Sequence, residues 1–478
     1  MCGGKKKNGK WNTEAHRDRI VYFDDTALKT LGETFEGSSD WLSVKLTNIH
    51  ANTIIKILEK YRNYPIHIRD LNEKIITRDI EETSGVSNNV IEKINGFVNS
   101  SYDVVYSGPH LYVCQPFYKS PYVHYRVNND YDVLDLSKID ENYSIRALYR
   151  RKMPLEKYVT LINGFQIGQD KDGKPLYDNW IDYYKFAYRR MLGNDSEHTL
   201  IGALLAPGIS HIHTINSITF KNVNNTVEFA GLSASIPVDF FVKVLGANDL
   251  TEGRIETLPF GISNKYRPSL FIRTLMLNCL TKHYSDLWNE MWNEKYKQES
   301  WSLEDSRLKP FHTLTEQWQW STPLRNYFER RLALVEIDVI VAMALGLSLQ
   351  DLETVYTIQF PILQQNENDT WYDAEGKIVF TCSKGLTGVG LDRPTWNNEI
   401  YKRDEIYEKH VDEWGHTVIS VRPEFSHISQ YSHISHIIDP KKSELYGGQQ
   451  QTFVAPYTRC DRIADYRTAW SHFEKKLI

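Results

Sequence analysis

The sequence predicts an α+β fold, with small mixed β-sheets or a meander in the N-terminal half and a helix-rich C-terminal half. Residues 102–149 are dense in aromatic side chains and proline, and residues 122–136 alternate between apolar and polar positions, which is typical of strands. Two long apolar runs with helical spacing, 268–296 and 323–345, lie in the second half. The 478 residues are 41% hydrophobic and 24% charged, which is typical of a chain that folds into several globular domains.

The first predicted elements follow a basic N-terminal arm. Residues 20–23 are apolar and predict a short strand. Residues 48–64 predict a helix, because apolar side chains recur at helical spacing and Pro65 ends the pattern. These apolar positions are Ile54, Ile57, Leu58 and Tyr61. Residues 86–98 predict another short helix, with Asn88 as a candidate cap.

The middle of the chain predicts one helix and two strands. Residues 179–192 have an amphipathic pattern that ends near two arginines, which favours a helix. Residues 199–205 and 212–220 are apolar and predict buried strands, separated by a Pro-Gly turn. The asparagine-rich stretch 222–226 is expected to be a loop.

Helices dominate the predictions for the second half of the chain. They are 232–245, 268–296, 323–345, 400–414 and 464–477. Within 334–394 the expected order is an apolar helix, a short acidic helix, a strand, a hairpin and a glycine-rich loop. The helix over 400–414 is expected on the surface, since it is charged. The closing helix ends in basic residues, which complement its dipole.

Composition limits the classes of function. A net charge of −5 argues against a uniformly basic nucleic-acid coat protein, but it is compatible with a local basic face on a DNA-binding protein. Five scattered cysteines show no CxxC or Cys/His metal spacing, and their odd number argues against a disulfide framework, so a reducing cytoplasm is expected. The sequence contains no signal-peptide pattern and no run of about 18 apolar residues, so no membrane segment is expected.

A family resemblance is carried by five long segments and the C-terminal end, in a fixed order. The segments are GPHLYVCQPFYKSP with YDVLDL, DYYKFAYRRML with HTLIGALLAPGISHIHTINSITF, LSASIPVDFFVKVLG with LPF, LFIRTLMLNCLTKHYSDLW, the stretch from ERRLALVEIDV to GKIVFT, and CDRIADYRTAWSHFEKKL. Together they cover nearly all of residues 60–478. The chain resembles the C-terminal half of large adenine-specific DNA methyltransferases of the fused restriction–modification (type IIG-like) class, which has relatives in phage-defence systems.

The resemblance implies a recognition half without its catalytic half. In such enzymes this half follows the methyltransferase domain and contains the target-recognition region that docks in the grooves of DNA. The chain has no Pro-Pro dipeptide, so it lacks the Asn/Asp-Pro-Pro-aromatic loop that holds a flipped adenine. Its glycine cluster, Gly385, Gly388 and Gly390, follows a predicted hairpin instead of opening a helix. We therefore expect no catalytic residue and no cofactor in this chain, with S-adenosylmethionine bound by a separate catalytic subunit.

Double-stranded DNA and a methyltransferase catalytic subunit are the implied partners, with other defence-system proteins as further candidates. The chain is expected to be either a separately encoded specificity subunit, which Met1 and the lysine-rich opening favour, or a fragment of a longer enzyme. Four regions are expected. They are a basic arm (1–40), a target-recognition-like α+β region that binds DNA (41–225), a helical scaffold (226–350), and a C-terminal α+β region with a hairpin and a closing helix (351–478).

Eight side chains are candidates for contacts with DNA. On the family reading, residues 60–220 read DNA, and lysine and arginine there suit phosphates and base edges, while histidine and tyrosine suit stacking or edge contacts. The candidates in this region are His110, Tyr112, Lys119, Arg126, Arg189 and Arg190. Arg150 and Arg151 belong to an Arg-Arg-Lys cluster at an expected domain junction. Plain surface charge is the alternative for the arginines.

Two other functions stay open. Asp373, Glu375 and Lys377 imitate the Asp…Glu-x-Lys core of magnesium-dependent nucleases, but a turn between two strands is favoured for them. The other alternative is a non-catalytic scaffold that binds only proteins of a defence complex. Two of the spacings among three histidines near the C-terminus would suit a metal, yet a solvated loop is favoured there because no carboxylate or cysteine lies at a matching spacing. These histidines are His427, His433 and His436.

Overall fold

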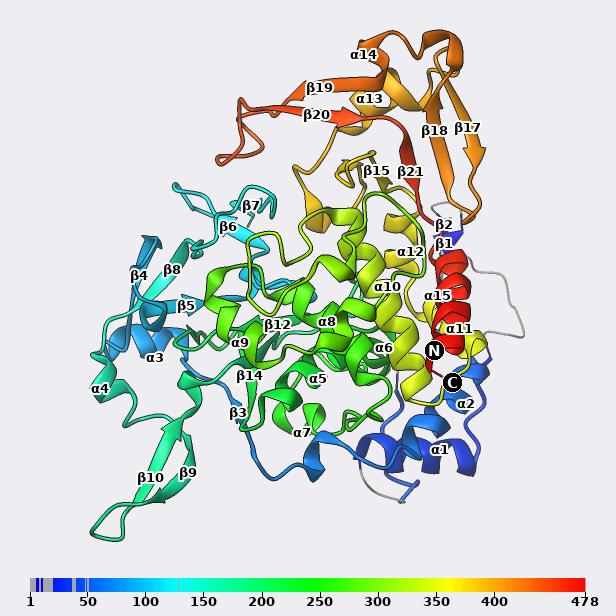
Figure 1. Cartoon of the computed structure of the whole chain (residues 1–478). Coiled ribbons are helices and arrows are strands. Elements are labelled where there is room, and N and C mark those ends of the chain that lie inside the picture. Colours follow the sequence, from blue (N-terminus) through cyan, green and yellow to red (C-terminus); the bar gives the residue numbers. More distant parts are fainter. Residues whose placement is uncertain are drawn as a thin grey trace.

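The computed structural model describes residues 6–7, 10–11, 20–36, 40–47, 49, 51–127 and 129–477. A central body carries two smaller lobes, which we call the N-lobe and the C-lobe (Figure 1). Each lobe has a small hydrophobic core that is separate from the large core of the body. The fold is α+β with several small sheets, as predicted.

The body is built from one antiparallel sheet and a layered group of helices. Its strands, in the spatial order β12-β11-β14-β3, are β3 (Lys74–Thr77), β11 (Lys185–Arg189), β12 (Gly202–Leu205) and β14 (Ile215–Phe220). Its helices are α1 (Asp25–Leu31), α2 (Asn52–Arg62), α5 (Val223–Ser233), α6 (Ile236–Val244), α7 (Glu252–Ile255), α8 (Arg267–Asn278), α9 (Ser285–Glu290), α10 (Tyr327–Ala344), α11 (Leu349–Gln359), α12 (Pro361–Glu367) and α15 (Arg462–Leu477). Helix α5 packs on the sheet, α8 packs on α5, and α10 lies between α8 and α15.

Helix α10 passes through the middle of the body. The Asn326 side chain accepts the Glu329 N–H while the Glu329 carboxylate accepts the Asn326 N–H, which is a complete capping box. The helix is buried on almost every side because α8, α11 and α15 cover it. Buried charged residues on it must therefore find partners on neighbouring helices.

The N-lobe consists of a four-stranded sheet, two short helices and a projecting hairpin. The sheet, in the order β13-β5-β8-β4, comprises β4 (Ile91–Gly96), β5 (Val104–Tyr106), β8 (Ala147–Arg151) and β13 (Ser210–His211). The remaining elements are α3 (Glu82–Ser87), α4 (Leu155–Tyr158) and the hairpin of β9 (Gly164–Gln169) and β10 (Pro175–Asn179), which extends away from the body (Figure 1). Another short hairpin, β6 (Lys119–Pro121) with β7 (Tyr131–Val133), lies between this lobe and the C-lobe (Figure 1).

The C-lobe spans residues 371–459 and contains a five-stranded sheet and a two-stranded ribbon. The sheet, in the order β16-β15-β21-β18-β17, comprises β15 (Trp371–Tyr372), β16 (Ile378–Phe380), β17 (Tyr407–Val411), β18 (Thr417–Val421) and β21 (Tyr457–Arg459). The ribbon pairs β19 (His433–Ile437) with β20 (Gln450–Val454), and the short helices are α13 (Arg393–Trp396) and α14 (Ser429–Ser432). In the N-terminal arm, β1 (Lys6–Lys7) pairs with β2 (Lys10–Trp11).

Several predicted elements are confirmed. The predicted helices over 48–64, 323–345 and 464–477 correspond to α2, α10 and α15, and the predicted strands over 199–205 and 212–220 correspond to β12 and β14. The four apolar positions that predicted α2 are buried. The single helix predicted over 232–245 corresponds to two helices, the end of α5 and all of α6. They are separated at Ser235, which caps α6. No helix among the described residues is long and apolar enough to cross a bilayer.

Three predicted helices are wrong because strand pairing overrides their local pattern. Residues 86–98 contain the end of α3 and strand β4, which pairs with β8. Residues 179–192 contain β11, which is central in its sheet and buried on both faces, so its apolar run imitates a helix face. Residues 400–414 contain β17, an edge strand whose charged side chains face solvent.

Three further predictions differ from the structure. Residues 20–23 form no strand. The expected loop over 222–226 begins helix α5, because the Asn222 side chain accepts the Asn224 N–H and caps it. The expected long helix over 268–296 is divided, since α8 ends at Asn278, whose amide accepts the Leu204 N–H and donates to the Thr274 carbonyl.

Candidate nucleic-acid interface

Four of the predicted DNA-contacting residues come together beside Tyr118, where they hold the loop before β6 against β11. The Tyr112 ring stacks on Tyr118 with centroids 4.6 Å apart, and its hydroxyl donates to Glu197 at 2.7 Å. Arg189 donates from Nε to the Gly108 carbonyl at 2.9 Å and from Nη2 to the Leu111 carbonyl at 2.6 Å. Its donors are therefore directed at the protein backbone, and its role in this conformation is to position the loop.

The other two members of this group, His110 and Lys119, are also withdrawn from solvent. His110 is fully buried, its Nδ1 accepts the Ser107 N–H, and burial lowers its pKa to about 3. Lys119 is half-buried above the Tyr118 ring, and burial together with Arg189 lowers its pKa. A direct DNA contact by His110 is excluded in this conformation, which corrects the expectation from the sequence.

The remaining four predicted arginines are scattered. Arg151 is buried, where it donates to the Tyr102 carbonyl and lies 3.4 Å from Asp103. Arg190 lies 3.4 Å from Asp249. Only two of the four have exposed side chains, Arg150, which pairs with Glu92 at 2.6 Å, and Arg126, in the loop between β6 and β7. The predicted residues thus form no continuous cationic surface.

The C-lobe ribbon, β19 with β20, presents a solvent face that is polar except for Ile437 and Val454, and sequence reasoning missed it. Its strands overlap two stretches of low complexity, SHISQYSHISHI and GGQQQ. Ile434 pairs with Phe453, and both are buried in the lobe core, so the opposite face of the ribbon points to solvent. That face carries the pairs His433–Val454, Ser435–Thr452 and Ile437–Gln450. The three-residue repeat of SHISHI places Ile434 and Ile437 on opposite faces of the strand, so no alternating pattern in the sequence could have revealed it.

The ribbon is anchored at both ends. One end rises from the C-lobe core, and the loop at the other end rests on the β6–β7 hairpin (Figure 1). The Asp132 carboxylate accepts the N–H groups of Glu444 at 3.1 Å and Leu445 at 2.9 Å, and the Tyr446 hydroxyl accepts the Asp135 N–H at 3.0 Å. These contacts hold the ribbon as a fixed span between the two parts of the molecule.

The predicted hairpin over 371–380 is confirmed, and its acidic residues serve the turn. The Asp373 carboxylate is buried and accepts the backbone N–H groups of Glu375 at 2.9 Å, Lys377 at 2.8 Å and Val454 at 3.2 Å. Burial raises the pKa of Asp373, although these hydrogen bonds oppose the shift. Glu375 and Lys377 pair with each other at 2.5 Å on the surface. The Asp373 oxygens are therefore already occupied, which favours a turn over a magnesium site.

The glycine cluster is a tight loop. Gly388 and Gly390 have φ values of 87° and 72°, in the left-handed region that favours glycine. A Cβ atom at Gly390 would lie 2.5 Å from the Val379 carbonyl oxygen, so the loop packs closely on β16. The long helix that would follow a phosphate-binding turn does not follow it.

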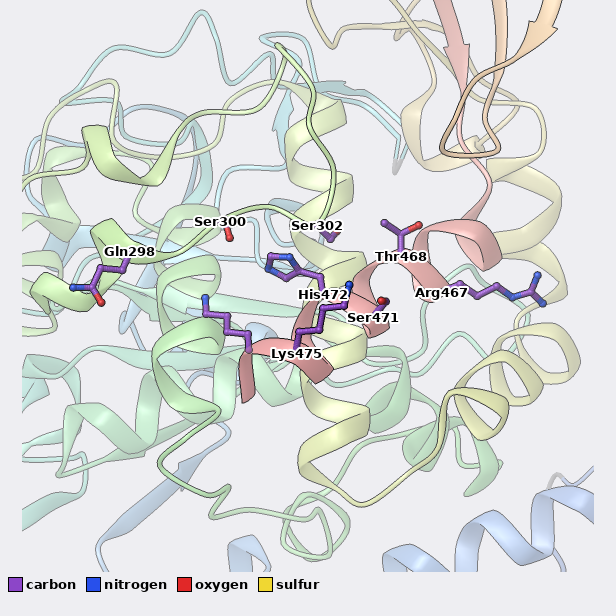
Figure 2. Close-up of a pocket in the computed structure, with 9 residues that line it drawn as sticks. Gln298, Ser300, Ser302, Arg467, Thr468, Ser471, His472 and Lys475 are labelled. Atoms are coloured by element: carbon purple, nitrogen blue, oxygen red, sulfur yellow. The ribbon is translucent and has the colours of Figure 1, made fainter. Parts of the chain in front are cut away.

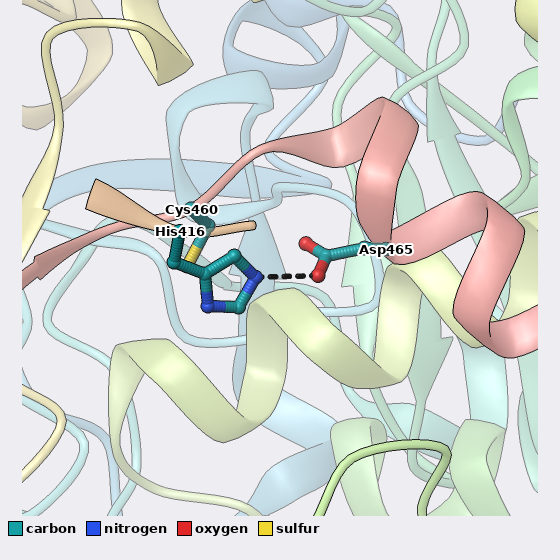
Figure 3. Close-up of side chains that lie close together, drawn as sticks. All are labelled: His416, Cys460 and Asp465. Carbon is teal, nitrogen blue, oxygen red and sulfur yellow. Dashed lines mark hydrogen bonds and ion pairs between the residues drawn. The ribbon is translucent and has the colours of Figure 1, made fainter. Parts of the chain in front are cut away.

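The three histidines of the C-terminal low-complexity stretch do not converge. His433 and His436 lie on β19, where a solvated loop was expected, and His427 lies in the preceding turn. Within the described parts of the chain, the group whose potential ligand atoms converge is instead His416, Cys460 and Asp465, all buried (Figure 3).

This buried His–Cys–Asp group is better explained as an ion network than as a metal centre. Asp465 accepts from His416 Nε2 at 2.6 Å (Figure 3). It also accepts from Arg331 Nη1 at 2.6 Å. Burial alone would raise the pKa of Asp465, but Arg331 and His416 outweigh it and lower the pKa. Burial raises the pKa of the Cys460 thiol to about 12, whereas a metal binds the thiolate. The Arg331 cation also disfavours a second cation beside it.

The chain matches no protein-family model, and no curated protein matches it.

Proposed function

We propose that the chain is the DNA-binding specificity subunit of a split adenine-N6 DNA methyltransferase in a restriction–modification or phage-defence system. In this proposal it holds duplex DNA for a separate catalytic subunit that binds S-adenosylmethionine. The sequence resemblance to the recognition half of such enzymes motivates the proposal. The solvent face of the C-lobe ribbon is the structural observation that supports it.

A two-stranded ribbon fits the major groove of B-DNA, which is about 12 Å wide. Glutamine pairs with adenine through its amide, and hydroxyls bond to several bases, so Gln450, Ser435 and Thr452 are of the residue types that read base edges. His433 adds a ring with both donor and acceptor capacity. Because both ends of the ribbon are anchored, these side chains are presented on a preorganised surface.

Substitution of His433 and Gln450 by alanine is expected to weaken specific binding to duplex DNA. Each lost base-edge contact costs about 1–3 kcal/mol, so the double variant is expected to bind the selected duplex at least about tenfold more weakly. Fluorescence anisotropy with a duplex selected from a random library measures this. The matched control is His312→Ala with Gln317→Ala, two exposed residues on the body. Equal affinity of the two double variants would contradict a role for the ribbon in DNA reading.

Methyl transfer is expected only when a catalytic subunit is present. The purified chain with S-adenosylmethionine and its duplex is expected to give no methylated adenine, and addition of a catalytic partner is expected to give methylation at the selected site. Mass spectrometry of the digested DNA measures N6-methyladenine. Methylation by the chain alone would overturn the split-subunit proposal. Absence of DNA affinity at low salt, with a stable protein complex, would instead favour the scaffold function.

A protein-binding role has its own structural observation. The β9–β10 hairpin projects from the N-lobe and exposes Ile167, Leu176 and Tyr177, each about half exposed (Figure 1). Exposed apolar side chains that gather on a projecting element are typical of protein contacts. This observation suits a scaffold, and it equally suits a specificity subunit that docks on a catalytic partner.

A further inference from the structure

A cavity on α15 is separate from the C-lobe ribbon and has a different chemistry. It has a volume of about 830 Å³ and lies between α15 and the segment 298–302 (Figure 2). Residues of α15 four positions apart line it in two rows, Arg467, Ser471 and Lys475 in one and Thr468, His472 and Lys476 in the other. The described lining residues include cations, hydroxyls and an amide but no carboxylate. Such a set of donors suits an anion.

A closed ion network lies beside the cavity and shares Lys476 with its lining. Arg273 donates to Glu336 at 2.5 Å and to Glu299 at 2.9 Å, and Lys476 lies 2.6 Å from Glu299. Two cations thus face two carboxylates. Arg467, at the rim, pairs with Glu353 at 2.8 Å. Lys475 is exposed and forms no ion pair within the described part of the chain, so its positive charge is available to a ligand.

Two polar atoms of the cavity wall lack partners. His472 Nε2 and Ser302 Oγ are both shielded from solvent and make no hydrogen bond. Burial lowers the pKa of His472, and Arg273 and Lys476 act in the same direction, while Glu336 and Glu299 only partly oppose the shift. Buried polar atoms without partners are uncommon in folded proteins, and a rotation of either side chain toward the cavity would let a ligand oxygen satisfy it.

We propose that this cavity binds the phosphate groups of a small phosphorylated ligand, of the pyrophosphate or nucleotide class. Lys475 supplies the charge, and the hydroxyls of Ser300, Ser302 and Ser471 donate hydrogen bonds to the phosphate oxygens. The ligand is small because the donors line one concavity on α15, whereas the C-lobe ribbon extends away from that helix (Figure 1). The proposal is independent of the DNA-binding function.

Calorimetric titration of the full chain with sodium pyrophosphate tests this site. The wild-type chain is expected to bind, and Lys475→Gln is expected to weaken binding about tenfold, because the charge-assisted hydrogen bond from its ammonium group to the phosphate is lost. Ser302→Ala is expected to weaken it by a smaller factor. Lys171→Gln, in the exposed β9–β10 loop, is the matched control and is expected to leave binding unchanged. Both lysines are exposed, so neither change is expected to alter the melting temperature.

Two results would overturn the proposal. One is the absence of pyrophosphate binding by the wild-type chain, and the other is equal binding by the Lys475 and Lys171 variants. A competition experiment distinguishes a small phosphorylated ligand from the DNA backbone as the source of the bound phosphate. A short DNA duplex that displaces pyrophosphate, and whose own binding requires Lys475, would assign the site to the DNA backbone and overturn the small ligand. Failure of this site leaves the His433 and Gln450 prediction untouched, because those residues lie on a different element.

Discussion

Replacement of Arg462 by methionine is expected to lower the free energy of unfolding by about 3–5 kcal/mol, the range found when one partner of a buried ion pair is removed. Arg462 begins α15 and is buried. It donates to Asp338 on α10 at 2.7 Å, and to both oxygens of Glu367 on α12 at 2.8 and 2.9 Å. Methionine fills a similar volume but satisfies neither carboxylate. The substitution therefore leaves buried charges without their main partner.

The two carboxylates respond differently to this environment. Burial raises the pKa of Asp338, and Arg462 and the Tyr466 hydroxyl only partly oppose it. Burial would also raise the pKa of Glu367, but Arg462 and Arg331 together outweigh it and lower the pKa. Glu367 faces two arginines and Asp338 only one, which explains the difference. Loss of Arg462 is therefore expected to raise the pKa of Asp338 most, and the Asp338 carboxylate is expected to take up a proton.

Urea denaturation followed by circular dichroism measures the effect of the Arg462 substitution. The matched control is Arg467→Met on the same helix, since Arg467 is exposed and pairs with Glu353 at the surface. Exposed ion pairs contribute little to stability, so this control is expected to unfold close to the wild-type midpoint. Identical midpoints for the two variants would show that the network does not hold α15 to the body.

Replacement of Trp396 by alanine is expected to destabilise the C-lobe by about 3–5 kcal/mol, the range for loss of a buried aromatic ring. Trp396 is fully buried, and its ring stacks on Phe380 with an interplanar angle of 4°. The ring centroids of Trp396 and Trp371 are 5.4 Å apart. These residues belong to the separate core of the C-lobe. The effect is therefore expected to stay local, with the C-lobe ribbon lost and the body still folded.

Hydrogen exchange measured by mass spectrometry distinguishes a local from a global effect. Amides of 371–459 are expected to lose protection in Trp396→Ala, while amides of α8 and α10 keep theirs. DNA affinity is expected to fall together with the protection of β19 and β20. Trp320→Ala, at a 41% exposed tryptophan of the body, is the control. Uniform loss of protection across both regions would refute the independence of the lobe.

The elements that the sequence could predict are those with a strong local signal. Helices α2, α10 and α15 combine periodic apolar positions with recognisable ends. Strand β11 could not be predicted, because a strand buried on both faces has no alternation and its apolar run fits a helix equally well. The charged strand β17 owes its structure to pairing with β18, which a single-sequence pattern does not contain.

The candidate DNA-contacting residues were predicted from residue type. Residue type does not reveal where a side chain points in the folded protein. Arg189 and Arg151 were chosen as cations, yet both direct their donors at backbone carbonyls of their own chain. The polar face of the C-lobe ribbon was missed for the opposite reason, since histidine, serine and glutamine repeats are common in loops. Ser302 and His472 both line the α15 cavity, although they are 170 residues apart in the sequence. No local sequence pattern predicts such a cavity.

The anchoring of the C-lobe ribbon also sets the order in which the molecule can be completed during synthesis. The loop of residues 439–446 binds Tyr122, Asp132 and Asp135, which were made more than 300 residues earlier. Closing so long a loop has an entropic cost, and it cannot occur before the ribbon has left the ribosome. Until then, the Asp132 carboxylate on the β6–β7 hairpin lacks the Glu444 and Leu445 N–H groups that it accepts in the folded protein. The proposed DNA-reading surface is therefore among the last parts of the protein to form.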